Sequence, residues 1–483
     1  MQSIKKRYNN IPQGLRATFW FLMCSFLQRG ISVITTPIFT RLLDTSEYGD
    51  FNVFQSWLTI LTVIVTLNLP WGVYPQGLVK LEEKKDRFAS SLQGLLLLLV
   101  IIWFVVYLLF KNQVNMLLGQ STSRMVAMFI LMWTSSIFCF WSAYERTELR
   151  YKNLVVLTII VSILKPLVGI YLVLTQTNKI TARIWGIVGV ELLCYVWLFI
   201  KQVKKGKVVF DKDLWKYALS FNIVLIPHYL SQTILSGADR IMIERMVSPD
   251  KAGIYSLAYS LSLIMLVFNS SLEQTINPWI FKQIKHKNFD SIKSVVYPAI
   301  VAVGIVNLLV MAFAPEIVKI FAPQSYYEAI WIIPPVSASV FFMFLYDMFA
   351  NFEFYYEKTK FISLATVTVA ILNILLNYLF IKKYGYFAAG YTTLFCYVFY
   401  SVFHYIVMRY MCLKDERQPY SLRFILTASI TVVASGMIIL FTYNYPYLRY
   451  GILLVAVAVS IIKRHYLTEK CKELLNKRKE AQE

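Results

Sequence analysis

The chain has 483 residues, of which 58% are hydrophobic and only 16% are charged, and its net charge is +21. A soluble domain carries about 25% charged residues, so this composition excludes an ordinary water-soluble enzyme. Most of the 48 Lys and Arg residues lie between apolar runs, where basic residues set membrane topology, so the positive charge does not indicate nucleic-acid binding.

The apolar residues come in runs of roughly twenty, long enough to cross about 30 Å of hydrocarbon. Because lipid offers no hydrogen-bond partner to an open backbone, such runs form helices. We therefore predict an all-α integral membrane protein with about fourteen transmembrane helices. In chain order the predicted spans are 15–40, 48–69, 89–110, 125–145, 154–175, 184–201, 214–246, 252–274, 294–313, 328–352, 361–381, 387–408, 420–441 and 446–463.

The connections between these spans favour a transporter over an enzyme. Lys and Arg gather in the N-terminal segment, in every second connection and in the C-terminal segment, which predicts that both termini are cytoplasmic. All connections are short, so they leave no room for a soluble catalytic domain. The sequence has no Walker motif, G-x-S-x-G, H-E-x-x-H or C-x-x-C. We predict no catalytic residues, no metal and no cofactor.

Two pairs of segments indicate an internal repeat. RLLDTSEYG at 41–49 matches RMVSPDKAG at 245–253, and Pro75 with the basic stretch after it matches Pro278 at almost the same offset. An even number of predicted helices separates the copies, so they have the same orientation in the membrane. The predicted organisation is two parallel six-helix lobes at 1–200 and 214–408, a basic cytoplasmic linker at 201–213, two additional helices at 409–463 and a basic tail at 464–483.

Two basic residues lie deep inside predicted spans, where an ionisable group is costly and usually faces a cavity. Arg29 is near the middle of the first span, beside Gly30. Lys165 is halfway along the fifth span, beside Pro166, which opens the backbone ladder. We hypothesise that both face a shared central cavity. The alternative for Arg29 is an internal ion pair or a contact to backbone carbonyls. The alternative for Lys165 is a hydrogen bond to the backbone carbonyl that Pro166 leaves without a donor.

Four further residues are candidates for gating or ion coupling. Asp239 and Arg240 lie in the ADRIMIER segment of the seventh span, where the alternatives are an extracellular gate and a structural salt bridge. Glu191 and Asp347 are intramembrane acids, for which ion coupling and structural pairing are the alternatives.

Two segments carry a resemblance to a known family: PIFTRLLDTSEYGDFNVFQSW at 37–57 and ADRIMIERMVSPDKAGIYSLAYSL at 238–261. They resemble the Wzx-like polysaccharide repeat-unit flippases, whose superfamily also holds the multidrug and toxic-compound extruders (MATE) and the lipid II flippase. The resemblance implies a MATE-like fold and alternating access between two lobes. It also implies a lipid-linked oligosaccharide substrate, moved across the bacterial inner membrane for O-antigen, capsule or exopolysaccharide synthesis. The implied partners are the bilayer, a polysaccharide polymerase and glycosyltransferases.

The implied substrate is linked to undecaprenyl diphosphate, whose headgroup needs fixed cations in a cavity. Arg29 and Lys165 are the residues that we expect to bind it. The alternative function is an ion-coupled multidrug or metabolite antiporter of the same fold, whose cavity favours acidic residues. Two deep cations and few deep acids favour the anionic substrate.

Overall fold

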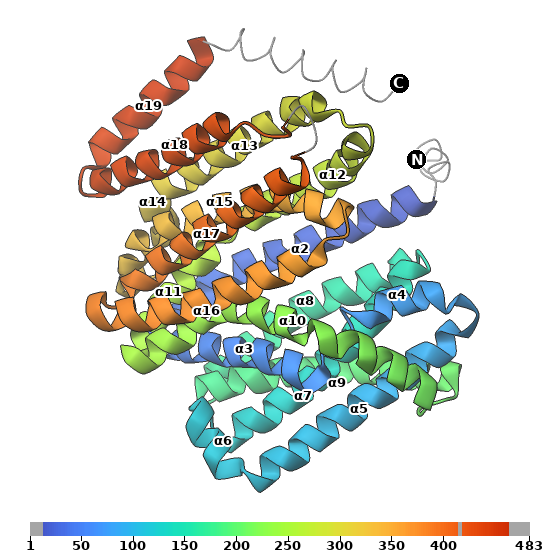
Figure 1. Ribbon diagram of the computed structural model, residues 1–483. Helices are drawn as coiled ribbons and strands as arrows, with labels where there is room; N and C mark the ends of the chain where they lie inside the picture. Colours follow the sequence, from blue (N-terminus) through green and yellow to red (C-terminus); the bar gives the residue numbers. More distant parts are fainter. Residues whose placement is uncertain (1–12, 414–417, 463–483) are drawn as a thin grey trace, which may run out of the picture. The chain divides into compact units, whose positions relative to one another are not determined.

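The computed structural model describes residues 13–413 and 418–462, and every regular element in these ranges is a helix (Figure 1). The chain divides into two compact units, which we call the first unit (residues 1–244) and the second unit (residues 245–483). The prediction of an all-α protein is confirmed. The predicted tail at 464–483 lies outside the described residues.

In the first unit, α9 contacts α5, α7 and α8, while α2 packs mainly on α8. The long helix α10 closes this unit. The helices are α2 (Gln13–Leu42), α3 (Thr45–Thr66), α4 (Val73–Lys80), α5 (Lys85–Leu109), α6 (Lys111–Leu118), α7 (Thr122–Thr147), α8 (Tyr151–Thr175), α9 (Lys179–Gly206) and α10 (Lys212–Met246), with a 3-10 turn η1 (Glu82–Lys84).

In the second unit, α15 is the central helix and contacts α11, α12, α13, α16, α17 and α18. The helices are α11 (Pro249–Ser262), α12 (Met265–Lys285), α13 (Phe289–Ala312), α14 (Ala314–Phe321), α15 (Ile333–Tyr355), α16 (Thr359–Tyr384), α17 (Phe387–Met411), α18 (Leu422–Phe441) and α19 (Pro446–Ile462), with 3-10 segments η2 (Gln324–Trp331) and η3 (Thr442–Asn444).

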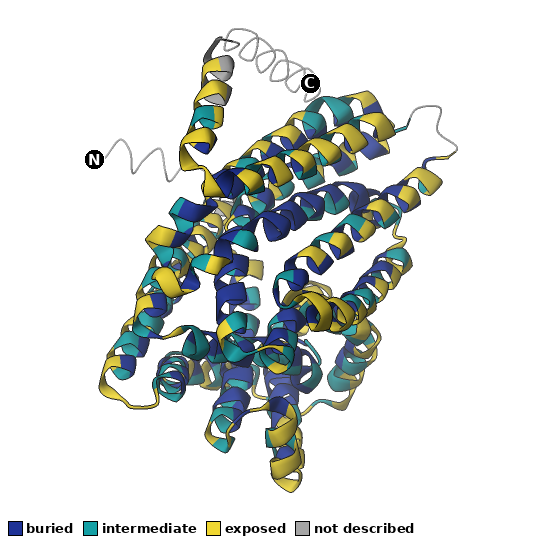
Figure 2. Ribbon diagram, turned by 90° about the vertical axis from the view of Figure 1, so that its left-hand side faces the viewer, coloured by how far each residue is buried: buried dark blue, intermediate teal, exposed yellow. Residues whose placement is uncertain are grey.

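The exposed faces of the long helices are apolar. On α8, for example, Leu164, Leu167 and Leu174 are exposed. Figure 2 shows such exposed residues along the outer sides of many helices, whereas the buried residues lie inside the packed helices. Water-exposed apolar faces of this extent are rare in soluble proteins, and hydrocarbon removes their cost. The protein is therefore a multi-pass membrane protein.

Twelve helices within the described ranges are long and apolar enough to cross a membrane. Helices α3 and α19 occupy predicted spans but fall short of this measure: the first half of α3 is polar, and α19 has 17 residues. The structure thus does not confirm a count of fourteen. The predicted span 252–274 is two helices, α11 and α12. Between them, the N–H groups of Ile264, Leu266 and Val267 bond to the carbonyl three residues earlier, as in a 3-10 helix, which interrupts the α-helical pattern.

The repeat seen in the sequence corresponds to two similar helix corners. Helix α2 ends at Leu42 and α10 ends at Met246. Two residues later, the Asp44 side chain accepts a hydrogen bond from the Glu47 N–H (2.7 Å), and Ser248 accepts one from the Lys251 N–H (3.3 Å). Each side chain caps the helix that follows. These matching caps support a duplication.

The basic segment 201–213, predicted to be a linker, packs on the first unit. A Cβ at Gly94 of α5 would lie 2.1 Å from the Val209 carbonyl oxygen, so the close approach requires glycine. Arg87 of α5 forms an ion pair with Asp211 (2.7 Å). These contacts fix the start of α10 on the first unit, and the division between the units falls in the last turn of α10, after Glu244. The grouping of helices into two transport lobes stays a prediction.

Candidate functional site

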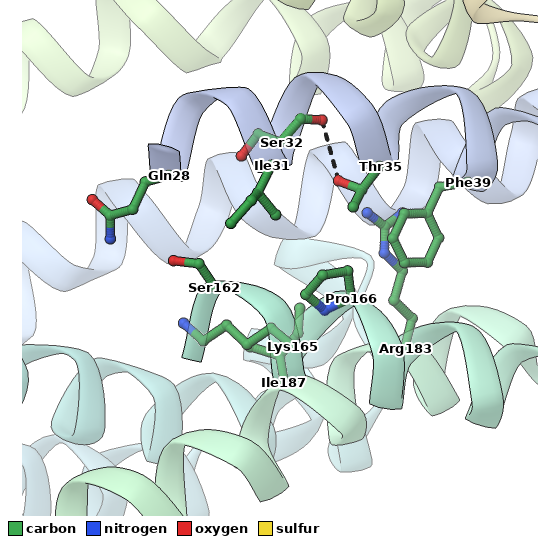
Figure 3. Close-up of a pocket in the computed structure, with 10 residues that line it drawn as sticks. All are labelled: Gln28, Ile31, Ser32, Thr35, Phe39, Ser162, Lys165, Pro166, Arg183 and Ile187. Atoms are coloured by element: carbon green, nitrogen blue, oxygen red, sulfur yellow. Dashed lines mark hydrogen bonds between the residues drawn. The ribbon is translucent and has the colours of Figure 1, made fainter. Parts of the chain in front are cut away.

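A polar cavity of about 250 Å³ opens between α2, α8 and α9 of the first unit (Figure 3). It contains two cationic side chains, Lys165 of α8 and Arg183 of α9. In Figure 3 the Lys165 ammonium and the Ser162 hydroxyl point towards the Gln28 end, whereas the Arg183 guanidinium lies beside Phe39. The lining residues are Gln28, Ile31, Ser32, Thr35, Phe39, Ser162, Lys165, Pro166, Arg183 and Ile187.

Arg183 is held between three helices. Its guanidinium carbon lies 3.6 Å from the ring centre of Phe39 on α2 and 3.6 Å from that of Phe51 on α3. Such cation–π contacts stabilise a guanidinium that has lost part of its water. Arginine suits this position better than lysine, because its planar, weakly hydrated group stacks on rings and keeps its N–H donors at the edge. The site therefore presents an oriented cation.

Lys165, which is partly exposed, forms an ion pair with the buried Glu191 of α9, with 2.6 Å between Nζ and Oε1. Glu191 is only 2% exposed, and its carboxylate also accepts hydrogen bonds from Thr134 (2.5 Å) and Ser135 (3.0 Å) on α7. Pairing and hydrogen bonding together compensate the loss of water around both charges. Structural pairing, one of the two readings left open for Glu191, is thus present.

Pro166 does not interrupt α8, which runs without a break from Tyr151 to Thr175. A proline has no N–H to offer the carbonyl one turn earlier, which here belongs to Ser162. Both Ser162 and Pro166 line the cavity, so the opened backbone position lies at this site.

Arg29 is exposed and is not among the residues that line this cavity, although its neighbour Gln28 is. The shared cavity expected for Arg29 and Lys165 therefore stays a prediction. Asp239 of α10 is buried (1% exposed), and Arg240 donates a hydrogen bond to the Ser236 carbonyl of its own helix (3.1 Å). Asp347, in the second unit, accepts one from the Asn277 amide (2.9 Å).

Arg183 was missed because the predicted sixth span began at residue 184, which left Arg183 in an outer connection. The helix begins earlier, at Lys179, since the Asn178 side chain accepts a hydrogen bond from the Thr181 N–H (3.1 Å) and caps it. An Asn directly before a helical pattern is a recognised start signal. If the predicted helix had been started at this Asn, Arg183 would have been placed inside the span.

The motif RLLDTSEYG has a structural role at the α2–α3 corner. Asp44 and Glu47 bond reciprocally to each other's backbone N–H, forming a capping box. Lys179, at the start of α9, donates to the Leu42 carbonyl (3.2 Å) and to Glu47 (3.3 Å). The motif therefore fixes α9, and with it Arg183, against the end of α2. Within the described residues, the acidic, His and Cys side chains form no cluster suited to a metal ion.

Comparison with protein families identifies the group to which this architecture belongs. A model described as "Polysaccharide biosynthesis protein" matches residues 15–284, more than half of the chain, and includes the whole cavity. The chain belongs to the polysaccharide biosynthesis protein family. A second model, MatE, matches residues 225–379. The predicted resemblance to polysaccharide flippases of the superfamily shared with the multidrug extruders is confirmed at the level of the family.

Individual relatives are distant. Lsg locus putative protein 1 of Haemophilus influenzae is 21% identical over 375 residues, covering 73% of this chain and 88% of that protein. The probable low-salt glycan biosynthesis flippase Agl15 of Haloferax volcanii is 19% identical over 396 residues, covering 80% of this chain and 82% of that protein.

Solved structures confirm the MATE-like fold. The lipid II flippase MurJ in an inward closed conformation has a TM-score of 0.68 at 15% identity, covering 92% of this chain and 99% of MurJ. An inward-facing MATE-family multidrug transporter has a TM-score of 0.60 at 11% identity, covering 80% of this chain and 96% of the other.

Proposed function

We propose that this protein is a flippase that moves an undecaprenyl-diphosphate-linked oligosaccharide across the bacterial inner membrane by alternating access. The product would serve the synthesis of a surface polysaccharide such as O-antigen, capsule or exopolysaccharide. Its family and the name of the Haloferax relative support a role in glycan assembly. The basic bias of alternate connections supports cytoplasmic termini. A polymerase and glycosyltransferases are the proposed partners in the pathway.

The observation that carries this proposal is the cationic cavity of the first unit. A diphosphate is recognised best by charge-assisted hydrogen bonds, and a guanidinium makes two of them at once. Arg183 is held between the rings of Phe39 and Phe51. Lys165 lies in the same cavity and adds an ammonium group, which also pairs with Glu191. We propose Arg183 and Lys165 as the headgroup ligands, with Arg29 as a further cation on α2.

The size of the cavity limits what it holds. Pockets that enclose drug-sized ligands have volumes of roughly 300–1,000 Å³. A cavity of about 250 Å³ suits a diphosphate but not an oligosaccharide. We therefore assign only the charged headgroup to this cavity.

A second feature suits the lipid part of such a substrate. An apolar groove of about 670 Å³ runs between α15, α17 and α18 of the second unit, lined by residues such as Phe342, Val402, Ile406 and Leu426. Arg409, in the last turn of α17, also lines it. We propose that a prenyl chain binds here, because the apolar lining offers the chain the same kind of surroundings as the lipid that it leaves.

An ion-coupled drug antiporter of the same fold is the competing function, and the MatE match favours it. A cavity for cationic drugs needs an uncompensated carboxylate. Next to this cavity the Glu191 carboxylate is already paired with Lys165. The first unit therefore favours an anion.

Complementation tests the proposal. In a strain that lacks the chromosomal gene, Arg183→Ala should reduce surface polysaccharide about tenfold to hundredfold, as expected for the loss of a charge-assisted bond of about 1.5–3 kcal/mol. Arg183→Lys should retain part of the function, because charge remains but bidentate geometry does not. Arg87→Ala, which removes an arginine paired with Asp211 away from the cavity, is the control. Full export by Arg183→Ala at normal membrane levels would refute the site.

A further inference from the structure

The second unit contains an ionisable pair that the proposed headgroup site does not use. Glu353 of α15 and His404 of α17 are both 0% exposed. Nδ1 of His404 lies 2.5 Å from Oε1 of Glu353, so the two side chains share a hydrogen bond. Charged or titratable groups buried this deeply in a membrane protein are expensive, and those that persist commonly belong to ion or proton pathways.

Each member of the pair has one polar atom left over. Oε2 of Glu353 and Nε2 of His404 are buried and have no hydrogen-bond partner among the residues that the structure describes. A pair that serves only to hold two helices together is expected to satisfy both ends, because an orphaned buried polar atom is costly. Nε2 is also the position at which a neutral imidazole accepts a proton when Nδ1 carries the hydrogen.

The surroundings of the pair are titratable or polar rather than simply apolar. The rings of Tyr346 and Tyr400 lie with their centres 5.7 and 4.6 Å from that of His404. Tyr400 shares a hydrogen bond with Thr366 of α16 (2.9 Å). The titratable groups that interact electrostatically with the pair or with these two tyrosines include Asp347 on α15 and Glu273 on α12.

The first unit has a buried carboxylate at a similar place, Glu145 near the end of α7, with neighbours other than histidine. Helices α7 and α15 end in the same way. Arg150 N–H donates to the Glu145 carbonyl and Lys358 N–H to the Glu353 carbonyl, both at 2.8 Å. The residue before each donor, Leu149 or Glu357, has a positive φ of 54° or 56°. Glu145 therefore occupies the same place in its helix end as Glu353, in a pattern that Gln283 of α12 also shows.

The partners of these two carboxylates differ. Electrostatic neighbours of Glu145 include Arg150 and, on α9, Lys201 and Lys205. These cations stay charged throughout the physiological range, whereas a histidine exchanges a proton within it. Among the described residues, the carboxylate thus has a histidine partner in the second unit and Lys and Arg neighbours in the first.

We propose that the Glu353–His404 pair binds the proton that is coupled to transport. In the unloaded state the Glu353 carboxylate accepts the Nδ1–H of a neutral imidazole. The incoming proton adds to Nε2 of His404, which gives an imidazolium–carboxylate pair, and its departure from Nε2 restores the first state. Only the N–H bond at Nε2 forms and breaks, and the pair changes from one negative charge to neutral. The proposal does not depend on the substrate of the first unit.

The test uses the purified full chain in lipid nanodiscs, with one spin label on each unit. Across about pH 5 to 8, the range in which histidine titrates, the distance distribution between the labels should change reversibly. Selective ¹⁵N-histidine labelling should show His404, one of four histidines, changing its protonation state together with the distance. Its signal is assigned by its loss in His404→Gln.

Three variants decide the outcome. The double variant E353Q/H404Q keeps hydrogen-bonding side chains and leaves no isolated buried charge, so it is expected to fold, and the pH response of the distance should vanish. Glu353→Gln removes the anion that stabilises the bound proton, so the change should require more acidic solution. Glu145→Gln, the control in the first unit, should respond like the parent chain. An unchanged response in E353Q/H404Q, or a His404 signal that is constant across this range, would overturn the proposal.

Discussion

Helices α7 and α15 end on the same backbone pattern, yet the first and second units contain different ionisable side chains among their helices. The first unit has Lys165, paired with Glu191, and Arg183 held by two rings. The second unit has Glu353 with His404, and Asp347 with Asn277. A repeated backbone thus tolerates different buried chemistry, provided that each charge has a partner. We infer a division of labour, with anion binding in the first unit and proton exchange in the second.

The two units also differ in how their ion pairs respond to the loss of a partner. When one side chain of a lysine–carboxylate pair is removed, the side chain that remains keeps its charge near physiological pH. A histidine that loses its carboxylate is able to become neutral in this range. The predictions below follow from this contrast and from the matched helix corners.

The largest expected effect is on the stability of the first unit. Lys165→Met leaves the Glu191 carboxylate buried with only Thr134 and Ser135 as partners, which should cost about 3–5 kcal/mol. The double variant K165M/E191Q keeps those two hydrogen bonds without a charge and should recover most of the loss. Thermal unfolding of the detergent-solubilised protein measures both. Equal stability of Lys165→Met and the parent chain would show that the pair is dispensable.

A smaller effect separates the two helix corners. Asp44 takes part in a capping box with Glu47, whereas Ser248 makes one longer bond of 3.3 Å to the Lys251 N–H. Asp44→Ala should cost about 1–2 kcal/mol and Ser248→Ala about 0.5–1 kcal/mol. The same unfolding assay ranks the two variants. A larger loss of stability for Ser248→Ala than for Asp44→Ala would contradict this ranking of the two caps.

The smallest effect concerns pH at the periphery of the second unit. The Lys251 ammonium, 2.5 Å away, and the Tyr386 hydroxyl donate hydrogen bonds to Glu328 and lower the pKa of this carboxyl below its ordinary value of 4.5. A lowered pKa contributes stability above the ordinary value, and this contribution disappears as the pH falls through the lowered value. Because Glu328 is about half exposed, the contribution should be below about 1 kcal/mol.

Glu328→Gln removes this pH-dependent contribution to the free energy of unfolding. Its stability relative to the parent chain should be lower at neutral pH, and the difference should shrink at about pH 3. Urea unfolding at the two pH values checks this. A difference that grows in acid would contradict the sign.

Much of the fold was accessible from the sequence because hydrophobic runs of membrane length have few alternatives to a helix. Helical segments cover most of each predicted span, with 252–274 divided between α11 and α12, and the corner at Asp44 and its counterpart at Ser248 were found as a repeat. The polar first half of α3 and the break at Leu263 were missed, since a hydropathy pattern averages over several turns.

The site was harder to predict than the fold. Lys165 was identified because a cation within an apolar run is conspicuous, but its partner Glu191 lies on the next helix, and which faces meet depends on packing. Arg183 was lost to an error of five residues at a helix start. Glu353 and His404 are far apart in the chain and meet only because α15 packs against α17.

The central claim is that the first unit binds a diphosphate through Arg183. Native mass spectrometry of the purified full chain measures it directly, with undecaprenyl diphosphate, undecaprenyl phosphate and undecaprenol as competing probes. The parent chain should prefer the diphosphate over the uncharged alcohol by about tenfold or more, and Arg183→Ala should lose that preference while still binding the lipid chain. An Arg183→Ala variant that keeps the full preference for the diphosphate would contradict the account.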